Sequence, residues 1–224
     1  MVDLLSNIKI SVPEKIFIKD PESSKLGKRI IEHSIILIDE IGFDSFTFKK
    51  LGHKIGSNES SIYRYFESKH KLLLYLTSWY WAWIEYQLVF ETHSIQDASE
   101  KLKKAIGIVC RTIKEDRKFS HINEITLNKI IINENSKAYL TKEVDIENKE
   151  GYFIIYKRLV MRLKDMILNI NPSYAYASSL ASTVAEGALH QHFLKEHFQS
   201  ITDSNDTTKK PSDFFVNLTF NAIK

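Results

Sequence analysis

The chain has 224 residues, of which 43% are hydrophobic, so it is long enough to bury a core in one or two domains. Its seven glycines and four prolines are few for this length, which disfavours β-sandwiches, barrels and glycine-rich nucleotide loops and favours long helices. The net charge of +3 diagnoses no partner by itself, and the single cysteine excludes an internal disulfide, in keeping with a reducing cytoplasm.

Residues 1–22 alternate apolar and polar side chains and contain Pro13 and Pro21, which predicts an extended N-terminal arm. Its lysines leave two alternatives open, an arm that follows a DNA groove and an arm that packs on the rest of the protein. The arm lacks the continuous apolar run of a signal peptide, and no span of about twenty apolar residues predicts a membrane helix. We therefore expect a cytoplasmic protein without membrane contact.

The next segment predicts a helix that begins at Ser23 or Ser24 and ends near Ile41, where Gly42 follows. Its stripe of isoleucines and leucines recurs at helical spacing, which indicates one buried face. Two much shorter helices follow within 47–66.

Residues 47–66 carry the most informative pattern in the chain. Thr47 can cap the first short helix, Gly56 supplies the left-handed backbone that ends it, and Asn58 can cap the second. So tight a turn makes the two helices cross steeply, with Gly52 where their backbones come closest. This arrangement predicts a helix-turn-helix, whose second helix enters the DNA major groove. An ordinary helical hairpin is the alternative.

The exposed side of this predicted motif offers side chains suited to phosphates and base edges. The candidate DNA-binding residues are Thr47, Lys49, Asn58, Glu59, Ser60, Ser61, Tyr63, Arg64, Tyr65, Lys69 and Lys71. Glu59 has two alternatives: it accepts from cytosine N4, or it stabilises the positive end of the helix dipole without touching DNA.

A long helix is predicted from Ser68 to about Glu91, and aromatic side chains recur along its second half. Such a stripe either fills the core or forms a wall of a ligand pocket. The candidate pocket residues for a small hydrophobic or aromatic ligand are Trp79, Trp83, Tyr86, Phe90, Tyr156 and His190.

The rest of the chain also predicts helices, over 95–115, 120–132, 136–145, 148–169, 173–198 and 212–223. The helix over 173–198 is rich in small residues, which let helices approach closely, and together with the apolar face of 152–168 they suggest a packed interface. The candidate dimer-interface residues are Phe153, Leu163, Ala181, Ala185 and Ala188.

No sequence motif predicts a catalytic site, and no cofactor is predicted. Glu186, His190 and His197 share a helix face, but they lack the HExxH order, and a pocket rim or a dimer contact explains them without a metal. Cys110 has apolar neighbours, which indicates a buried thiol rather than a reactive sensor. We therefore predict neither an enzyme nor a metal site.

Several features combine from Arg29 onward: an apolar first helix that ends at Gly42 and Phe43, Thr47, a small residue at 52, Gly56, and then the run 62–66 followed by Ser68 and Lys69. This segment resembles the N-terminal DNA-binding domain of the tetracycline-repressor (TetR) family of bacterial transcription regulators. His33, Ser34, Ser57 and Glu59 depart from the usual pattern of that family. These departures bear on the operator sequence more than on the resemblance.

The resemblance implies an all-α fold with a three-helix helix-turn-helix head and a larger C-terminal helical bundle. We expect an arm over 1–22, a DNA-binding domain over 23–70, and a ligand-binding and dimerisation domain over 71–224. The implied function is a homodimeric repressor that binds a palindromic operator in double-stranded DNA and is released by an inducer, whose binding the long fourth helix transmits. The alternative is a helical ligand-binding or protein-interaction module whose head no longer reads DNA.

Overall fold

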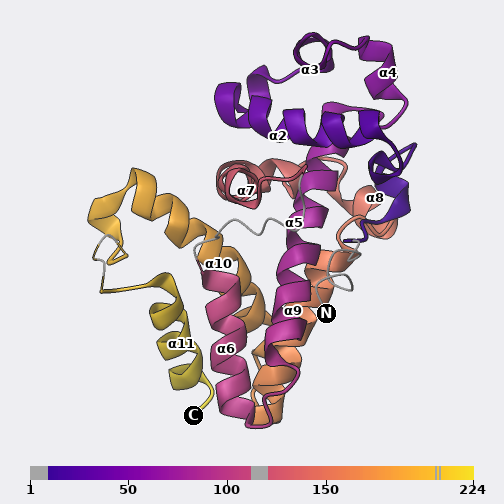
Figure 1. The fold of residues 1–224 in the computed structure, drawn as a ribbon. Helices are drawn as coiled ribbons and strands as arrows, with labels where there is room; N and C mark the ends of the chain where they lie inside the picture. The colour runs from indigo at the N-terminus through magenta and orange to yellow at the C-terminus, as the bar shows by residue number, and fades with distance from the viewer. Residues whose placement is uncertain (1–9, 112–120, 205, 207) are drawn as a thin grey trace. The chain divides into compact units, whose positions relative to one another are not determined.

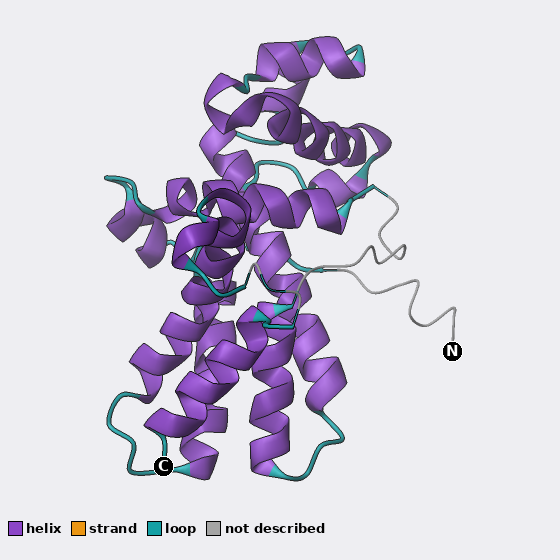
Figure 2. Ribbon diagram, turned by 90° about the vertical axis from the view of Figure 1, so that its left-hand side faces the viewer, coloured by secondary structure: helices purple, strands orange, loops and turns teal. Residues whose placement is uncertain are grey.

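The computed structural model describes residues 10–111, 121–204, 206 and 208–224, and every regular element among them is helical (Figure 1 and Figure 2). Three single-turn 3-10 helices, Glu14–Ile16, Pro21–Ser23 and Gln199–Ile201, accompany the α-helices. The α-helices are α2 (Lys25–Ser45), α3 (Phe48–Ile55), α4 (Glu59–Tyr63), α5 (Lys69–Thr92), α6 (Ala98–Cys110), α7 (Glu124–Tyr139), α8 (Val144–Lys149), α9 (Ile154–Ile170), α10 (Ala177–His197) and α11 (Pro211–Ala222). The predicted all-α fold is confirmed. No helix in the described part of the chain is long and apolar enough to cross a bilayer.

Most predicted helices match the observed ones apart from shifts of their ends, but the predicted breaks between 132 and 154 are wrong. The chain forms α7 to Tyr139, α8 over Val144–Lys149 and α9 from Ile154, in place of the predicted 120–132, 136–145 and 148–169. The predicted helix end at 132 and the predicted start at 136 lie beside the polar run 133–137, whereas α7 continues through this run to Tyr139. Leu127, Ile131, Asn135 and Ala138 are all buried, so the apolar stripe passes through the polar run. The predicted helix ends at 115 and 120 lie outside the described residues.

The chain divides into two compact units, one formed by Met1–Ala82 and Ile113–Ile155 and the other by Trp83–Thr112 and Tyr156–Lys224. The first unit holds α2, α3, α4, α7 and α8 with the beginning of α5, and the second holds α6, α9, α10 and α11 with its end. α7 packs against α2, so the first unit extends beyond the DNA-binding segment. The predicted division by function stays a prediction.

The reading head consists of α2, α3 and α4 (top of Figure 1). The Ser24 hydroxyl oxygen accepts from the Gly27 amide at 3.1 Å and caps α2. Gly42 has a φ of 75°, so the regular helix breaks there and a short additional turn leads to α3. The core of the head is fully buried and contains Ile30, Ile31, Ile35, Phe46, Leu51, Ile62 and Phe66.

The turn between α3 and α4 has the predicted backbone. Thr47 Oγ1 accepts from the Lys50 amide at 3.2 Å, and Gly56 is left-handed with φ 60°. The Ser57 amide donates to the Gly52 carbonyl at 2.9 Å, which closes the turn. Asn58 occupies the N-cap position of α4, but its side chain makes no capping hydrogen bond.

The described part of the N-terminal arm, residues 10–22, packs on the protein, and whether it also follows a DNA groove stays a prediction. Ile16 is buried, and the Ile18 amide donates to the Tyr65 carbonyl at 2.8 Å. The Lys19 ammonium lies 5.2 Å from the centroid of the Tyr65 ring. The arm is partly extended, as predicted, and it also contains the two short 3-10 turns.

The second unit is held together by close helix contacts and one buried carboxylate. A Cβ added to Gly187 would stand 2.6 Å from the Phe215 ring, so this glycine lets α10 and α11 approach. Glu85 is buried, and Arg158 Nε and Arg162 Nε donate to its Oε1 at 2.7 and 2.6 Å. Burial raises the Glu85 pKa, but the hydrogen bonds and charges of the two arginines outweigh it and hold the pKa below its ordinary value.

We expect Gly52→Ala to lower the free energy of unfolding by about 1–3 kcal/mol, because the new Cβ would overpack the turn. That Cβ would stand 2.7 Å from the backbone oxygen of Ser57. The control is Gly107→Ala within α6, where no atom lies within 4 Å of the added Cβ. The control should be stabilised by up to about 1 kcal/mol. Differential scanning calorimetry measures both, and equal stabilities would contradict the close approach.

We expect Glu85→Gln to lower the free energy of unfolding by about 1–3 kcal/mol at neutral pH. A carboxylate with a depressed folded-state pKa stabilises the fold above its unfolded pKa of about 4.3, and that contribution disappears as the pH falls through the folded pKa. The variant should therefore lose less stability on acidification than the parent. Urea denaturation across this pH range measures the difference. Glu100→Gln, which removes an exposed pair with Lys103, is the control and should change little.

Candidate nucleic-acid interface

The second helix of the turn presents a polar face. Ile62 is fully buried and fixes α4 on the core, so the residues on either side of it point outward. Ser60 and Arg64 are exposed, and Ser61 is half-buried. The Tyr63 ring packs edge-on against Phe48 with centroids 5.0 Å apart, yet 47% of Tyr63 remains exposed. This is an orientation in which a short helix can meet base edges.

Ten of the eleven predicted DNA-binding residues are exposed or half-buried. Eight of these ten lie in or next to α3 and α4, and they are Thr47, Lys49, Asn58, Glu59, Ser60, Ser61, Tyr63 and Arg64. Glu59 lies in the first turn of α4, which is compatible with both of its predicted alternatives. These residues surround the second helix of the turn, as the sequence pattern indicates.

The other three predicted residues point into the protein. Only 3% of Tyr65 is exposed, and its hydroxyl lies 2.8 Å from the Ser24 hydroxyl. The Lys71 ammonium lies 3.7 Å from the centroid of the Tyr152 ring and 3.9 Å from Glu147 Oε1. The Lys69 ammonium donates to three backbone carbonyls. Helical spacing predicts on which side of a helix these residues lie. It does not predict which other groups of the protein contact that side.

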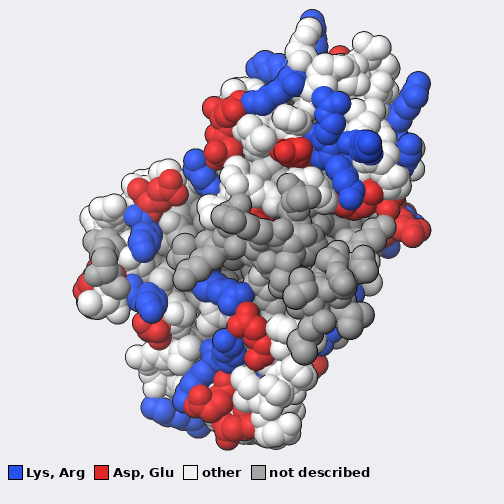
Figure 3. All heavy atoms as spheres, viewed as in Figure 1, with Lys and Arg blue, Asp and Glu red and all other residues white. Residues whose placement is uncertain are grey.

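Basic side chains around the turn also make internal contacts. Arg29 Nη2 donates to the Ile55 carbonyl at 2.6 Å and so satisfies the end of α3, a role the sequence did not predict. Lys50 donates to the Ser45 carbonyl at 2.8 Å, and Lys54 pairs with Glu40 at 2.5 Å. Figure 3 shows Lys and Arg side chains gathered over the head, with acidic side chains among them.

The six predicted pocket residues do not share one surface. Trp79 and Trp83 are fully buried, whereas Phe90 and His190 are exposed and Tyr86 and Tyr156 are half-buried. Trp79 lies in the first compact unit and Trp83 in the second. A cavity of about 470 Å³ lies instead near the end of α10 and the start of α11. Its lining includes Gln191, Thr202, Lys209, Asp213, Phe214 and Asn217 and none of the predicted six.

Four of the five predicted interface residues face the inside of the protomer. Leu163, Ala181, Ala185 and Ala188 are buried, and Phe153 is half-buried. The three alanines therefore pack within one chain. The exposed apolar side chains of the second unit are different ones and include Met161, Phe198, Phe214 and Leu218.

Of the chemically reactive side chains in the described residues, Cys110 is buried and His192 is half-buried. Burial raises the pKa of the Cys110 thiol to about 12, which leaves almost no thiolate at neutral pH. Burial also lowers the pKa of His192, whose Nε2 lies 2.9 Å from the Cys110 carbonyl. Among the described residues, no three His, Cys, Asp or Glu side chains are placed to hold a metal ion.

A short exposed helix held on a compact helical head by a tight turn defines the class of helix-turn-helix DNA-binding domains. Residues 30–76 match the family model described as "Bacterial regulatory proteins, tetR family". Residues 30–76 thus match the DNA-binding domain of the TetR family, which confirms the resemblance seen in the sequence.

A solved structure supports the same fold. The TetR family transcriptional regulator PfmR from Thermus thermophilus aligns with a TM-score of 0.54 at 12% sequence identity. The alignment covers 87% of this chain and 97% of that chain. At this identity the likeness shows the fold alone. No curated protein matched in a sequence comparison.

Proposed function

We propose that this protein is a homodimeric transcriptional repressor that binds a palindromic operator and releases it when a small inducer binds. The observation that carries the proposal is the exposed face of α4, with Ser60, Tyr63 and Arg64 presented from a helix-turn-helix of the TetR type. Serine and arginine can read base edges, and the tyrosine hydroxyl can reach phosphate. No catalytic step is part of the proposal.

Dimerisation follows from the size of the reading helix. α4 spans only Glu59–Tyr63, so one copy can contact only a few base pairs. Two copies related by a twofold axis would read two half-sites about 34–36 Å apart, which gives the length of sequence that a specific operator needs. We propose that the second unit forms the dimer, through exposed side chains rather than the buried small residues of α10.

Release would use α5, since this helix supplies Lys69–Ala82 to the first unit and Trp83–Thr92 to the second. An inducer that binds the second unit and displaces α5 would change the orientation of the head. The accessible aromatic side chains near the end of α5, Tyr86 and Phe90, support a hydrophobic or aromatic inducer. The cavity of about 470 Å³ in the second unit has a volume typical of small-molecule sites. We place the protein in the cytoplasm, where operator DNA lies.

We expect the purified protein to bind one inverted repeat in the DNA that flanks its own gene, with an affinity that falls steeply as salt rises. Electrophoretic mobility shift assays across a salt series measure both properties, and a duplex of random sequence is the control. Equal affinity for both duplexes, or no binding, would contradict the proposal and favour a helical module whose head does not read DNA.

We expect Arg64→Ala to reduce operator affinity by about 1–3 kcal/mol and to relax selectivity at one base pair, because arginine can grip guanine O6 and N7 together. Lys49→Ala is the matched control, since a phosphate contact weakens binding to all sequences alike. Fluorescence anisotropy with single-base operator variants measures the effect. An equal loss on every variant would reassign Arg64 to phosphate.

A further inference from the structure

The corner between α2 and α3 sets the direction in which the reading helices leave α2. Gly42 breaks α2, and the residues that follow it form one more turn before Thr47 begins α3. The Phe46 amide donates to the Gly42 and Phe43 carbonyls, each at 3.2 Å. This turn connects α2 to α3, and the hydrogen bond from the Ser57 amide to the Gly52 carbonyl closes the next turn, which leads to α4.

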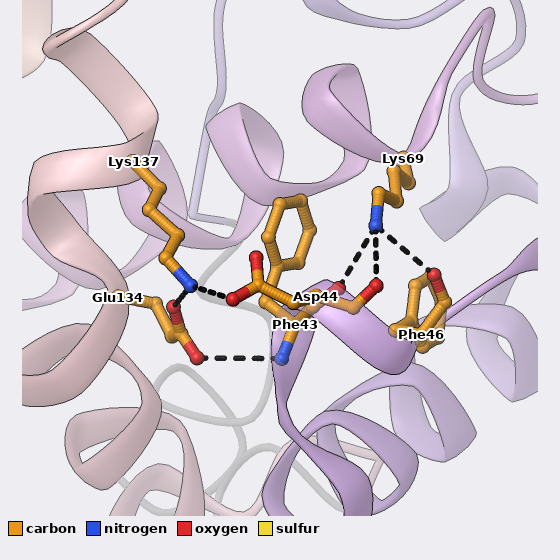
Figure 4. A network of polar contacts seen from close by, with 6 residues as sticks. All are labelled: Phe43, Asp44, Phe46, Lys69, Glu134 and Lys137. Carbon is orange, nitrogen blue, oxygen red and sulfur yellow. Dashed lines mark hydrogen bonds and ion pairs between the residues drawn. The ribbon is translucent and has the colours of Figure 1, made fainter.

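The Lys69 ammonium occupies the inside of this corner (Figure 4). It donates to the carbonyls of Phe43 and Asp44, each at 3.0 Å, and to the Phe46 carbonyl at 3.3 Å. It also lies 4.8 Å from the centroid of the Phe43 ring. An ammonium has three protons, and these three acceptors match them. The acceptors lie at the C-terminal end of α2, where the helix dipole favours a cation.

The other side of the corner is held by α7 (Figure 4). Glu134 Oε1 accepts from the Phe43 amide at 3.3 Å, and the Lys137 ammonium bridges Asp44 Oδ2 at 2.8 Å and Glu134 Oε2 at 2.9 Å. All these residues belong to the first compact unit. Lys69 and Lys137 therefore lie on opposite sides of the corner. Lys137 pairs with carboxylates, whereas Lys69 donates to the three backbone carbonyls.

We propose that Lys69 is a positioning residue that fixes the direction of α3 and α4 and does not bind a DNA phosphate. This inference rests on the proposed DNA-binding function. To reach a phosphate, the ammonium would leave three acceptors at the end of a helix without their charged donor, and hydrogen bonds to charged groups are stronger than those between neutral groups. A phosphate contact would have to exceed that loss while exposed to salt.

The test compares Lys69→Met and Lys69→Arg with the matched control Lys49→Met, which removes an exposed lysine of α3. Arginine keeps the charge and binds phosphate at least as well, but its planar guanidinium does not direct three protons to these three carbonyls. The first readout is amide hydrogen exchange over residues 43–56 in the free protein. The second is affinity for the operator duplex and for a random duplex of about 30 base pairs across a salt series.

If Lys69 is a positioning residue, amide hydrogen exchange over residues 43–56 should be about tenfold faster or more in both Lys69→Met and Lys69→Arg. Lys49→Met should leave this exchange unchanged. Operator affinity should fall in both Lys69 variants without a change in salt dependence. In Lys49→Met the slope of log affinity against log salt should become shallower by about 0.9, the value for one phosphate.

A phosphate role would overturn the proposal. In that case Lys69→Arg would keep full affinity, Lys69→Met would lose about 0.9 of the salt slope, and exchange would stay at the parent rate. If the parent protein binds neither duplex, the proposed function fails, and the exchange measurement still decides whether Lys69 fixes the corner. If Lys69→Met does not fold, Lys69→Arg supplies both readouts.

Discussion

The close approach of α3 to the turn before α4 governs the reading head. A side chain on Gly52 would collide with the backbone of Ser57, and Gly56 adopts a left-handed conformation that other residues avoid. Because both positions are glycine, the turn closes and the two helices cross within a few residues. The burial of Ile55 and Ile62 follows from this crossing, and so does the outward direction of the polar side chains of α4.

The sequence predicted the elements whose signals are local. Thr47, Gly42 and Gly56 begin or end helices through their own side chains or backbone conformations, so the head could be outlined before any contact was known. The wrong break in α7 shows the limit of local signals. A polar run favours a helix end, but burial of Asn135 among apolar neighbours keeps the helix intact, and burial depends on distant parts of the chain.

The candidate site was predicted less completely because helical spacing does not say what covers a face. The sequence predicts Tyr65 and Lys69 as phosphate ligands. In the structure the Tyr65 hydroxyl contacts Ser24 and the Lys69 ammonium contacts the end of α2, and both partners are more than twenty residues away in the sequence. The sequence predicts that the alanines of α10 lie in an interface between two protomers, yet they are buried inside one protomer. Small residues signal that two helices are close, and they carry no information on whether one chain or two supplies them.

The packing of the arm and of α7 against the head bears on how the protein can be divided for study. A fragment cut at residues 23 and 70 would lose Ile16 and the Ile18 backbone bond at one end. It would also lose the partners of Asp39 and Asp44, which are Lys129 and Lys137 of α7. The compact unit that contains the helix-turn-helix is therefore discontinuous in sequence. Minimal DNA-reading fragments and domain swaps between regulators would have to carry α7 and the arm along with the helix-turn-helix.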